Sequence, residues 1–172
     1  MSTYIKGANT YLPDIKPFTP DYKFLSAVLD TRTDKYDANY QALNNLYNKV
    51  VYADLSRADN IDKRNQYTST IAPQLEKVSG LDLSVMQNAD MAKSVFAPFF
   101  EDDVLVKDIM FTSAYKREMQ DANRLLDSAD PDISDKWWDP GIKALNYQME
   151  DFINATSDQA LAMGMPKYVP DA

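Results

Sequence analysis

Residues 21–52 read DYKFLSAVLDTRTDKYDANYQALNNLYNKVVY, a run that contains neither proline nor glycine. Large apolar residues recur in it every seven positions, at Leu29, Tyr36, Leu43 and Val50, and a companion row holds Leu25, Arg32, Asn39 and Leu46. This spacing predicts one long helix that ends near Val51 or Tyr52 and spans roughly 45 Å. Because polar residues interrupt the seam, we interpret this helix as the spine of a helical bundle rather than as half of an isolated coiled coil.

Two further helices are predicted directly after this spine. The first covers about 59–78, with Gly80 placed to terminate it. Pro73 lies inside its pattern, so we expect a kink or break just before that residue, because proline lacks the N–H that the helix ladder uses. The second takes Ser84 as its N-cap and reaches Ala97, before Pro98.

A longer helix is expected after the aromatic end of this pair. Asp102 or Asp103 opens it, and apolar residues recur along it as far as about Leu126. Residues 127–135 contain Pro131 and several aspartates, which favours a loop.

Cap signals predict the last two helices. Asp139 supplies an N-cap and Pro140 the residue favoured in a first helical turn, which starts a helix through Phe152. Ser157 is expected to cap a short helix ended by Gly164. Sustained alternation is missing and four glycines are few for tight hairpins. We therefore predict an all-α fold: an irregular bundle of about five to six helices, one of them long and N-terminal, with extended arms at both ends.

The two ends of the chain differ from this helical domain, which covers residues 21–164. Residues 1–20 combine three prolines with large apolar side chains, and disordered tails are normally poor in aromatics. We interpret them as an extended arm that lies in a groove of its own domain or of a neighbour. Residues 165–172 are expected to form an extended, linker-like tail. We interpret this tail as leading into the rest of a longer polypeptide. The candidate partner-binding residues of the arm are Tyr11, Leu12, Ile15 and Phe18.

Composition narrows the chemistry that the chain can perform. Its 172 residues include no histidine and no cysteine, which excludes imidazole proton transfer, thiol nucleophiles and ordinary zinc sites. The carboxylates comprise 22 Asp and four Glu, namely Glu76, Glu101, Glu118 and Glu150. A glycosidase-like pair would need a Glu in a cleft, yet each Glu lies in a charged helical surface. We expect no enzymatic activity, no cofactor and no metal.

Charge is distributed unevenly along the chain. The net charge is -8, with residues 1–80 contributing +1 and residues 81–172 contributing -9. An acidic surface repels the phosphate backbone, which disfavours sequence-independent nucleic-acid binding, and we expect no direct sequence-specific binding either. We predict that the acidic half faces solvent or the path of a DNA molecule that it does not bind. No apolar stretch reaches the length of a membrane span, and the N-terminus lacks the apolar core of a signal peptide. These features favour a protein made in a cytoplasm.

Two segments invite a functional interpretation that competes with a plainer one. Residues 130–135 alternate oxygen side chains as a calcium loop does, but Asp135 stands where glycine is needed and Gly141 where a bidentate Glu is needed. We interpret them as a turn. Trp137 and Trp138 either plug the end of the bundle or anchor a partner, since tryptophan is enriched among residues that dominate binding energy.

Several phrases in a fixed order resemble the N-terminal region of large virion proteins from tailed bacteriophages of the crAss-like group and related short-tailed phages. The resemblance covers about residues 11–170. It rests on YLPDIKPF (11–18) with DYKFL (21–25), DNI (59–61) with Arg64, VSGLDLS (78–84), VFAP (95–98), VKDIM (106–110) and the Trp137-Trp138 pair.

The resemblance implies a virion structural or cargo protein held in the head–tail conduit or tail lumen, and it brings no catalytic residue with it. Its expected partners are other virion proteins of tail, portal or neck, met in several copies set by symmetry. It would be made in the host cytoplasm and located in the virion. The alternative is the non-catalytic leader domain of a longer ejected enzyme that degrades cell wall or transcribes phage genes.

Overall fold

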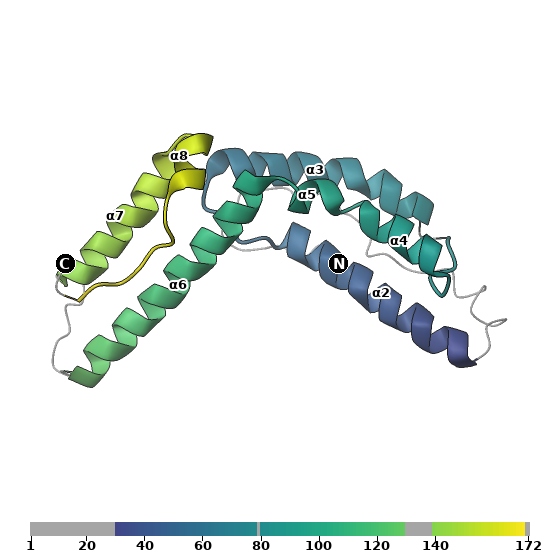
Figure 1. Cartoon of the computed structure of the whole chain (residues 1–172), viewed down its shortest axis with the longest axis horizontal. Helices are drawn as coiled ribbons and strands as arrows, with labels where there is room; N and C mark the ends of the chain where they lie inside the picture. The colour runs from purple at the N-terminus through teal and green to yellow at the C-terminus, as the bar shows by residue number, and fades with distance from the viewer. Residues whose placement is uncertain (1–29, 79, 130–138, 171–172) are drawn as a thin grey trace, which may run out of the picture. The chain divides into compact units, whose positions relative to one another are not determined.

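The computed structural model describes residues 30–78, 80–129 and 139–170, and its regular structure in these ranges is entirely helical (Figure 1). The predicted all-α fold is confirmed. The helices are α2 (Asp30–Val51), α3 (Ala58–Val78), α4 (Met86–Ser94), α5 (Ala97–Phe100), α6 (Asp103–Ala129), α7 (Pro140–Asn154) and α8 (Ser157–Ala162).

The described chain gathers into two compact units. Unit 1 comprises the described part up to residue 52 together with residues 63–99. Unit 2 comprises residues 53–62 and the described part from residue 100 onward. The first residues of α3 therefore belong to unit 2 and the remainder of that helix belongs to unit 1.

The heptad seam of α2 forms the core of unit 1, as its spacing predicts. Tyr36, Leu43 and Val50 are all buried, and α2 ends at Val51. Helix α2 packs against α4. The polar seam residue Asn39 donates from Nδ2 to the carbonyl of Leu83 at 2.8 Å, and its Oδ1 accepts from Lys93 Nζ at 3.1 Å. A polar residue in the seam thus binds neighbouring segments of the same unit.

Of the kink or break predicted just before Pro73, the break is wrong, because α3 continues through this residue to Val78. Pro73 itself is exposed. Ile71 and Leu75 on either side of it are buried, so packing holds both halves of the helix in place despite the lost hydrogen bond.

The third predicted helix, expected over 84–97, is shorter and divided in two. Ser84 does not cap it: the N–H and hydroxyl of Ser84 both donate to Asp82 Oδ1, and Val85 occupies the N-cap position. Asp82 therefore organises a turn before α4, since an aspartate acceptor competes for nearby backbone donors. Helix α4 stops at Ser94, and buried Phe96 and Phe99 anchor the short α5 that follows.

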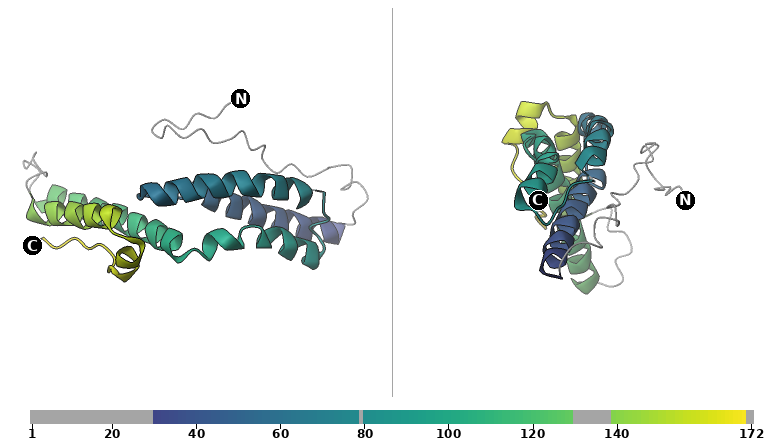
Figure 2. Two further views of the ribbon diagram at one scale, coloured as in Figure 1. Left: turned by 90° about the horizontal axis from the view of Figure 1, so that it is seen from above. Right: turned by 90° about the vertical axis from the view of Figure 1, so that its right-hand side faces the viewer.

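Unit 2 is built on α6, which packs against α7 and α8 (Figures 1 and 2). Asp102 opens α6 as predicted, accepting the N–H groups of Val104 and Leu105 at 3.1 Å. The helix extends to Ala129, so the loop predicted from residue 127 starts later.

The N-cap of α7 is the predicted residue, whereas the N-cap of α8 is a different one. Asp139 Oδ1 accepts the N–H of Ile142 at 2.9 Å with Pro140 in the first turn, as predicted. Helix α8 is capped by Thr156, one residue before the predicted Ser157, and it ends at Ala162, with Met163 as its C-cap directly before Gly164. Gln159 explains the shift, because its side chain binds back to the Thr156 N–H and completes a capping box.

No helix in the described part of the chain is long and apolar enough to cross a membrane.

Candidate functional site

The residues that the sequence nominates for partner binding lie outside the described residues. This holds for Tyr11, Leu12, Ile15 and Phe18 of the arm and for Trp137 and Trp138. It also holds for the calcium-like segment at residues 130–135. The described residues instead reveal two built arrangements in unit 2 that the sequence analysis does not identify.

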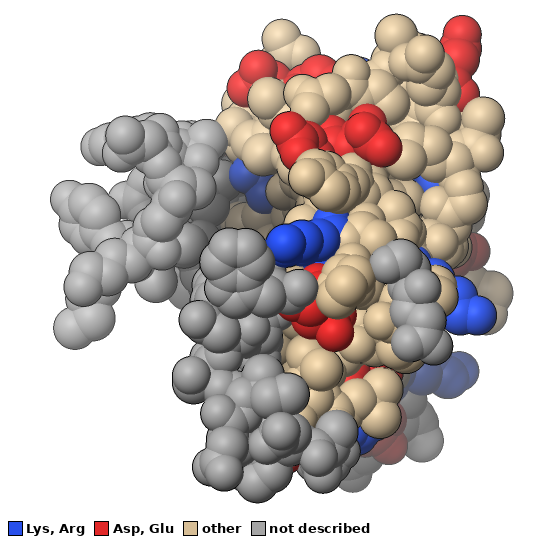
Figure 3. All heavy atoms as spheres, turned by 90° about the vertical axis from the view of Figure 1, so that its left-hand side faces the viewer, with Lys and Arg blue, Asp and Glu red and all other residues tan. Residues whose placement is uncertain are grey.

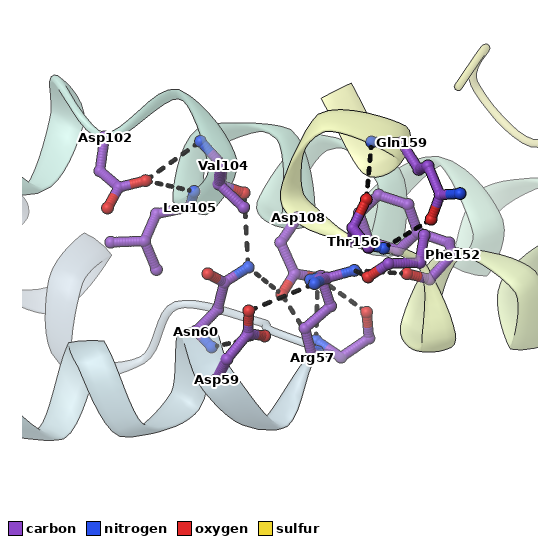
Figure 4. A network of polar contacts seen from close by, with 12 residues as sticks. Arg57, Asp59, Asn60, Asp102, Val104, Leu105, Asp108, Phe152, Thr156 and Gln159 are labelled. Carbon is purple, nitrogen blue, oxygen red and sulfur yellow. Dashed lines mark hydrogen bonds and ion pairs between the residues drawn. The ribbon is translucent and has the colours of Figure 1, made fainter. Parts of the chain in front are cut away.

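The first arrangement, which we call the Arg57–Asp108 junction, begins with a buried carboxylate (Figure 4). Asp108 has no exposed surface although it carries a charge. Its Oδ1 accepts the N–H of Ser56 at 3.0 Å and the Ser56 hydroxyl at 2.7 Å, and its Oδ2 accepts the N–H of Arg57 at 3.1 Å. Asn60 Nδ2 and the Thr112 hydroxyl add bonds of 3.0 and 3.1 Å. A residue in the second turn of α6 thereby satisfies backbone donors just before the start of α3.

Arg57 completes the junction from the other side. It is 4% exposed, so its charge needs partners. Its Nη1 donates to the carbonyls of Phe152 and Ala155, both at 2.7 Å, and its Nη2 lies 3.2 Å from Asp59 Oδ2. The first two acceptors lie at the C-terminal end of α7, where a helix dipole favours a cation. Arg57 and Asp108 therefore bind the ends of two helices.

Aromatic packing encloses the guanidinium. The Arg57 guanidinium carbon lies 5.7 Å from the centre of the Phe152 ring, a cation–π distance. The Phe152 ring stacks on Phe111 with centroids 3.9 Å apart and planes 5° from parallel. Among the described residues, Arg57 Nε and Asn60 Oδ1 are buried without a hydrogen-bond partner. The charged groups of the junction bind backbone groups. Such contacts hold helices in place, so the junction has a structural role.

A sequence signal for this junction exists. Asp108 lies on the apolar face of α6 shared by Leu105 and Phe111, and all three side chains are buried. A charge at a core position of an amphipathic helix indicates a buried polar partner. Arg57 lies in no comparable pattern, so its role emerges only from the structure.

The second arrangement is the segment 163–170, which we call the C-terminal strap. It is non-helical, as predicted, but it is not linker-like: it runs back along α6 and α7 (Figures 1 and 2). The Tyr168 ring is buried in a cluster with Ala122, Ile142 and Leu145. Gln148 binds the backbone of Lys167 twice, donating to its carbonyl at 3.2 Å and accepting its N–H at 3.0 Å.

The four glutamates occupy surfaces, with one exception. Glu76, Glu101 and Glu150 are exposed. Glu118 is partly buried, and its Oε2 accepts the N–H of Tyr168 at 3.0 Å. The sequence places Glu118 in a charged helical surface and gives no sign of this contact with the distant Tyr168.

Two tyrosines of unit 1 have raised pKa values. Burial raises the pKa of Tyr67 to about 12, an effect partly offset by a backbone hydrogen bond from Phe99. The Tyr67 hydroxyl donates to the carbonyl of Val95, and its ring lies 5.6 Å from that of Phe99. Burial, with a smaller contribution from Tyr52, also raises the pKa of Tyr47. Both hydroxyls stay neutral at physiological pH and act in packing.

Hollows in the described residues offer little to a small ligand. An open, shallow one of about 600 Å³ lies between α7 and α8, lined by Asp151, Asn154, Ala155, Gln159, Ala162 and Met163. A second, large enough for about one water, is enclosed by Leu43, Asn44, Tyr47, Leu75 and Phe96. No cluster of acidic side chains suited to a metal occurs in the part of the chain that is described.

Large apolar side chains are exposed on both units. Those of unit 1 include Met86 and Met91 on α4, which are 77% and 53% exposed. Those of unit 2 include Met110 and Tyr147, which are 54% and 65% exposed. On the face drawn in Figure 3, acidic and basic side chains are interspersed with uncharged surface. Methionine and tyrosine are enriched at protein interfaces, so these positions suit contacts with other proteins.

Comparison with protein-family models, curated proteins and solved structures finds no match to this chain.

Proposed function

We propose that this chain is a structural or cargo protein of a tailed-bacteriophage virion, docked in the head–tail conduit or tail lumen. The observation that carries the proposal is the ordered set of sequence phrases between residues 11 and 170 that resemble the N-terminal region of such virion proteins. The proposed role is non-enzymatic, and its partners are other virion proteins met in several symmetric copies. The protein would be made in the host cytoplasm and then packaged.

The arrangement of polar groups supports an assembly role. The buried ions Arg57 and Asp108 are bonded to helix ends and backbone, which gives unit 2 a fixed shape. Exposed Met86, Met91 and Tyr147 offer apolar contact area for other proteins. A protein with a rigid interior and apolar surface residues is suited to contacts with neighbouring subunits.

Mass spectrometry of gradient-purified particles tests this proposal. Peptides from this chain are expected in intact particles, while a phage replication protein from the same infection serves as the control that should be depleted. A second sample, taken after triggered genome release, separates the two forms of the proposal: cargo leaves the particle and a structural subunit stays. Abundance in infected-cell lysate together with absence from intact particles would contradict the proposal.

A further inference from the structure

The chain repeats a short pattern of an aromatic residue, any residue, proline and aspartate. It occurs as YLPD at residues 11–14, as FTPD at residues 18–21 and as YVPD at residues 168–171. The chain has 18 Phe and Tyr, nine Pro and 22 Asp, and a random order of them would give well under one such match. The first copy lies in the N-terminal arm and the second spans the end of that arm, with Asp21 just beyond it. The third copy begins in the C-terminal strap, and its last residue, Asp171, lies outside the described residues.

The first two residues of the third copy, Tyr168 and Val169, occupy a specific seat on unit 2, which we call the Tyr168 seat. The Tyr168 side chain packs into the cluster of Ala122, Ile142 and Leu145, with Tyr115 and Met119 at its margin. The N–H of Tyr168 donates to Glu118 Oε2 at 3.0 Å, and its hydroxyl donates to Asp139 Oδ1 at 3.4 Å. The seat therefore binds the aromatic residue by its ring, its backbone and its polar tip.

Gly141 leaves room in the seat for the backbone of the residue that follows the aromatic one. A Cβ at Gly141 would lie 2.4 Å from the Val169 carbonyl oxygen and 2.6 Å from Tyr168 Cε2. No side chain can be added there without displacing the strap, although alanine would favour the helix itself. The atom closest to this Cβ is the backbone oxygen of Val169. Any residue in place of Val169 would therefore present the same carbonyl oxygen to Gly141.

The arm copies carry the groups that the seat binds. Tyr11 and Phe18 each bring an aromatic ring and a backbone N–H for Glu118, and Leu12 and Thr19 bring the carbonyl that faces Gly141. Tyr11 also brings the hydroxyl for Asp139, which Phe18 lacks. Residues 11–14 are thus the better match of the two.

We propose that the Tyr168 seat is a receptor for aromatic-x-Pro-Asp segments, and that its exchange partner is residues 11–14 of a second copy of this chain. Each chain carries three matching segments, whereas the described residues hold one seat, and that seat is filled by the chain's own strap. The strap is tethered through α8, which gives it a high effective concentration. An arm from another copy displaces it only when chains are crowded together, as in an assembly. The inference does not rest on the virion proposal.

Fluorescence anisotropy with a labelled peptide of residues 8–16 tests the exchange. The receptor is the full chain with Tyr11→Ala and Phe18→Ala, which removes its own competing arm segments. Adding Tyr168→Ala should empty the seat and tighten the peptide Kd at least tenfold. Adding Gly141→Val to that receptor should abolish the gain, and a Tyr11→Ala peptide should bind at least tenfold more weakly.

A peptide of residues 164–172 serves as the positive control for the emptied seat. If it binds and the arm peptide does not, the seat serves only the chain's own strap and the proposal fails. Failure of both peptides to bind a receptor whose circular-dichroism spectrum matches the parent also overturns it.

Sedimentation equilibrium of the wild-type chain gives an independent test should the Tyr168→Ala receptor unfold. Self-association should weaken at least tenfold on combining Tyr11→Ala with Phe18→Ala, while Tyr52→Ala, at a position that is 59% exposed, should leave it unchanged. A wild-type chain that stays monomeric at its highest soluble concentration contradicts the proposal.

Discussion

Asp108 and Arg57 act at the scale of single residues by binding the ends of helices that lie far apart in the sequence. Asp108 accepts the N–H groups of Ser56 and Arg57 before α3, and Arg57 donates to carbonyls at the end of α7. Each ion is buried, so its energetic value depends on keeping every partner. Loss of one partner should therefore cost more than an ordinary hydrogen bond.

Asp108→Asn should lower the free energy of unfolding by about 3 kcal/mol. The substitution replaces one carboxylate oxygen, which accepts hydrogen bonds, with an amide NH2 group that can only donate to neighbours that are themselves donors. Urea unfolding at neutral pH measures the change. Asp151→Asn, at an exposed position of α7 in the same unit, is the matched control and should stay within about 0.5 kcal/mol of wild type. Equal effects of the two substitutions would show that the junction adds no stability.

Tyr67 gives a prediction for alkaline pH. Its pKa is raised to about 12 in the folded chain, above the value near 10 of an unfolded tyrosine. Because the folded state binds the proton more tightly, its contribution to stability is complete below pH 10 and is lost as pH rises toward 12. The difference in unfolding free energy between wild type and Tyr67→Phe should therefore narrow across this interval. Chemical denaturation at a series of pH values tests it, and a constant difference would refute it.

Helix α3 shows at the scale of elements how packing overrides a local signal. Pro73 removes one hydrogen bond of the helix, yet the buried neighbours Ile71 and Leu75 keep the helix continuous. Pro73→Ala should raise the free energy of unfolding by about 1–2 kcal/mol, since the restored hydrogen bond is partly offset by a more flexible unfolded chain. Thermal unfolding measures this.

Pro140→Ala is the control for this prediction. Pro140 lies in the first turn of α7, where its missing N–H has no helical partner to lose. It should gain nothing on substitution. If both prolines respond alike, the hydrogen bond lost at Pro73 costs the folded chain no stability.

Sequence predicted those elements whose signals are local. The seven-residue spacing predicted the buried face of α2, and Asp102 and Asp139 predicted two helix starts through their side-chain oxygens. Ser84 is not the predicted N-cap, because its N–H donates to Asp82 instead. Thr156 replaces the predicted cap Ser157, because Gln159 completes a capping box with Thr156. The junction and the strap could not be predicted in the same way, because Arg57, Gln148 and Glu118 act on partners distant in sequence.

The arm carries the prediction at the scale of the whole molecule. Deleting residues 1–20 should leave helical circular dichroism and cooperative melting largely intact, because the core of α2 lies at Tyr36, Leu43 and Val50. Self-association and incorporation into particles should weaken, since burial of each large apolar side chain contributes roughly 1.5–3 kcal/mol. Melting without cooperativity would instead place the arm in the chain's own core.

We propose above all that this chain is a building component of a particle rather than a catalyst. Absolute quantification with isotope-labelled peptides in purified particles tests it most directly. The account predicts several copies per particle, in a ratio to a tail structural protein that stays constant from one preparation to the next. A trace amount that varies between preparations, or no signal at all, would contradict it.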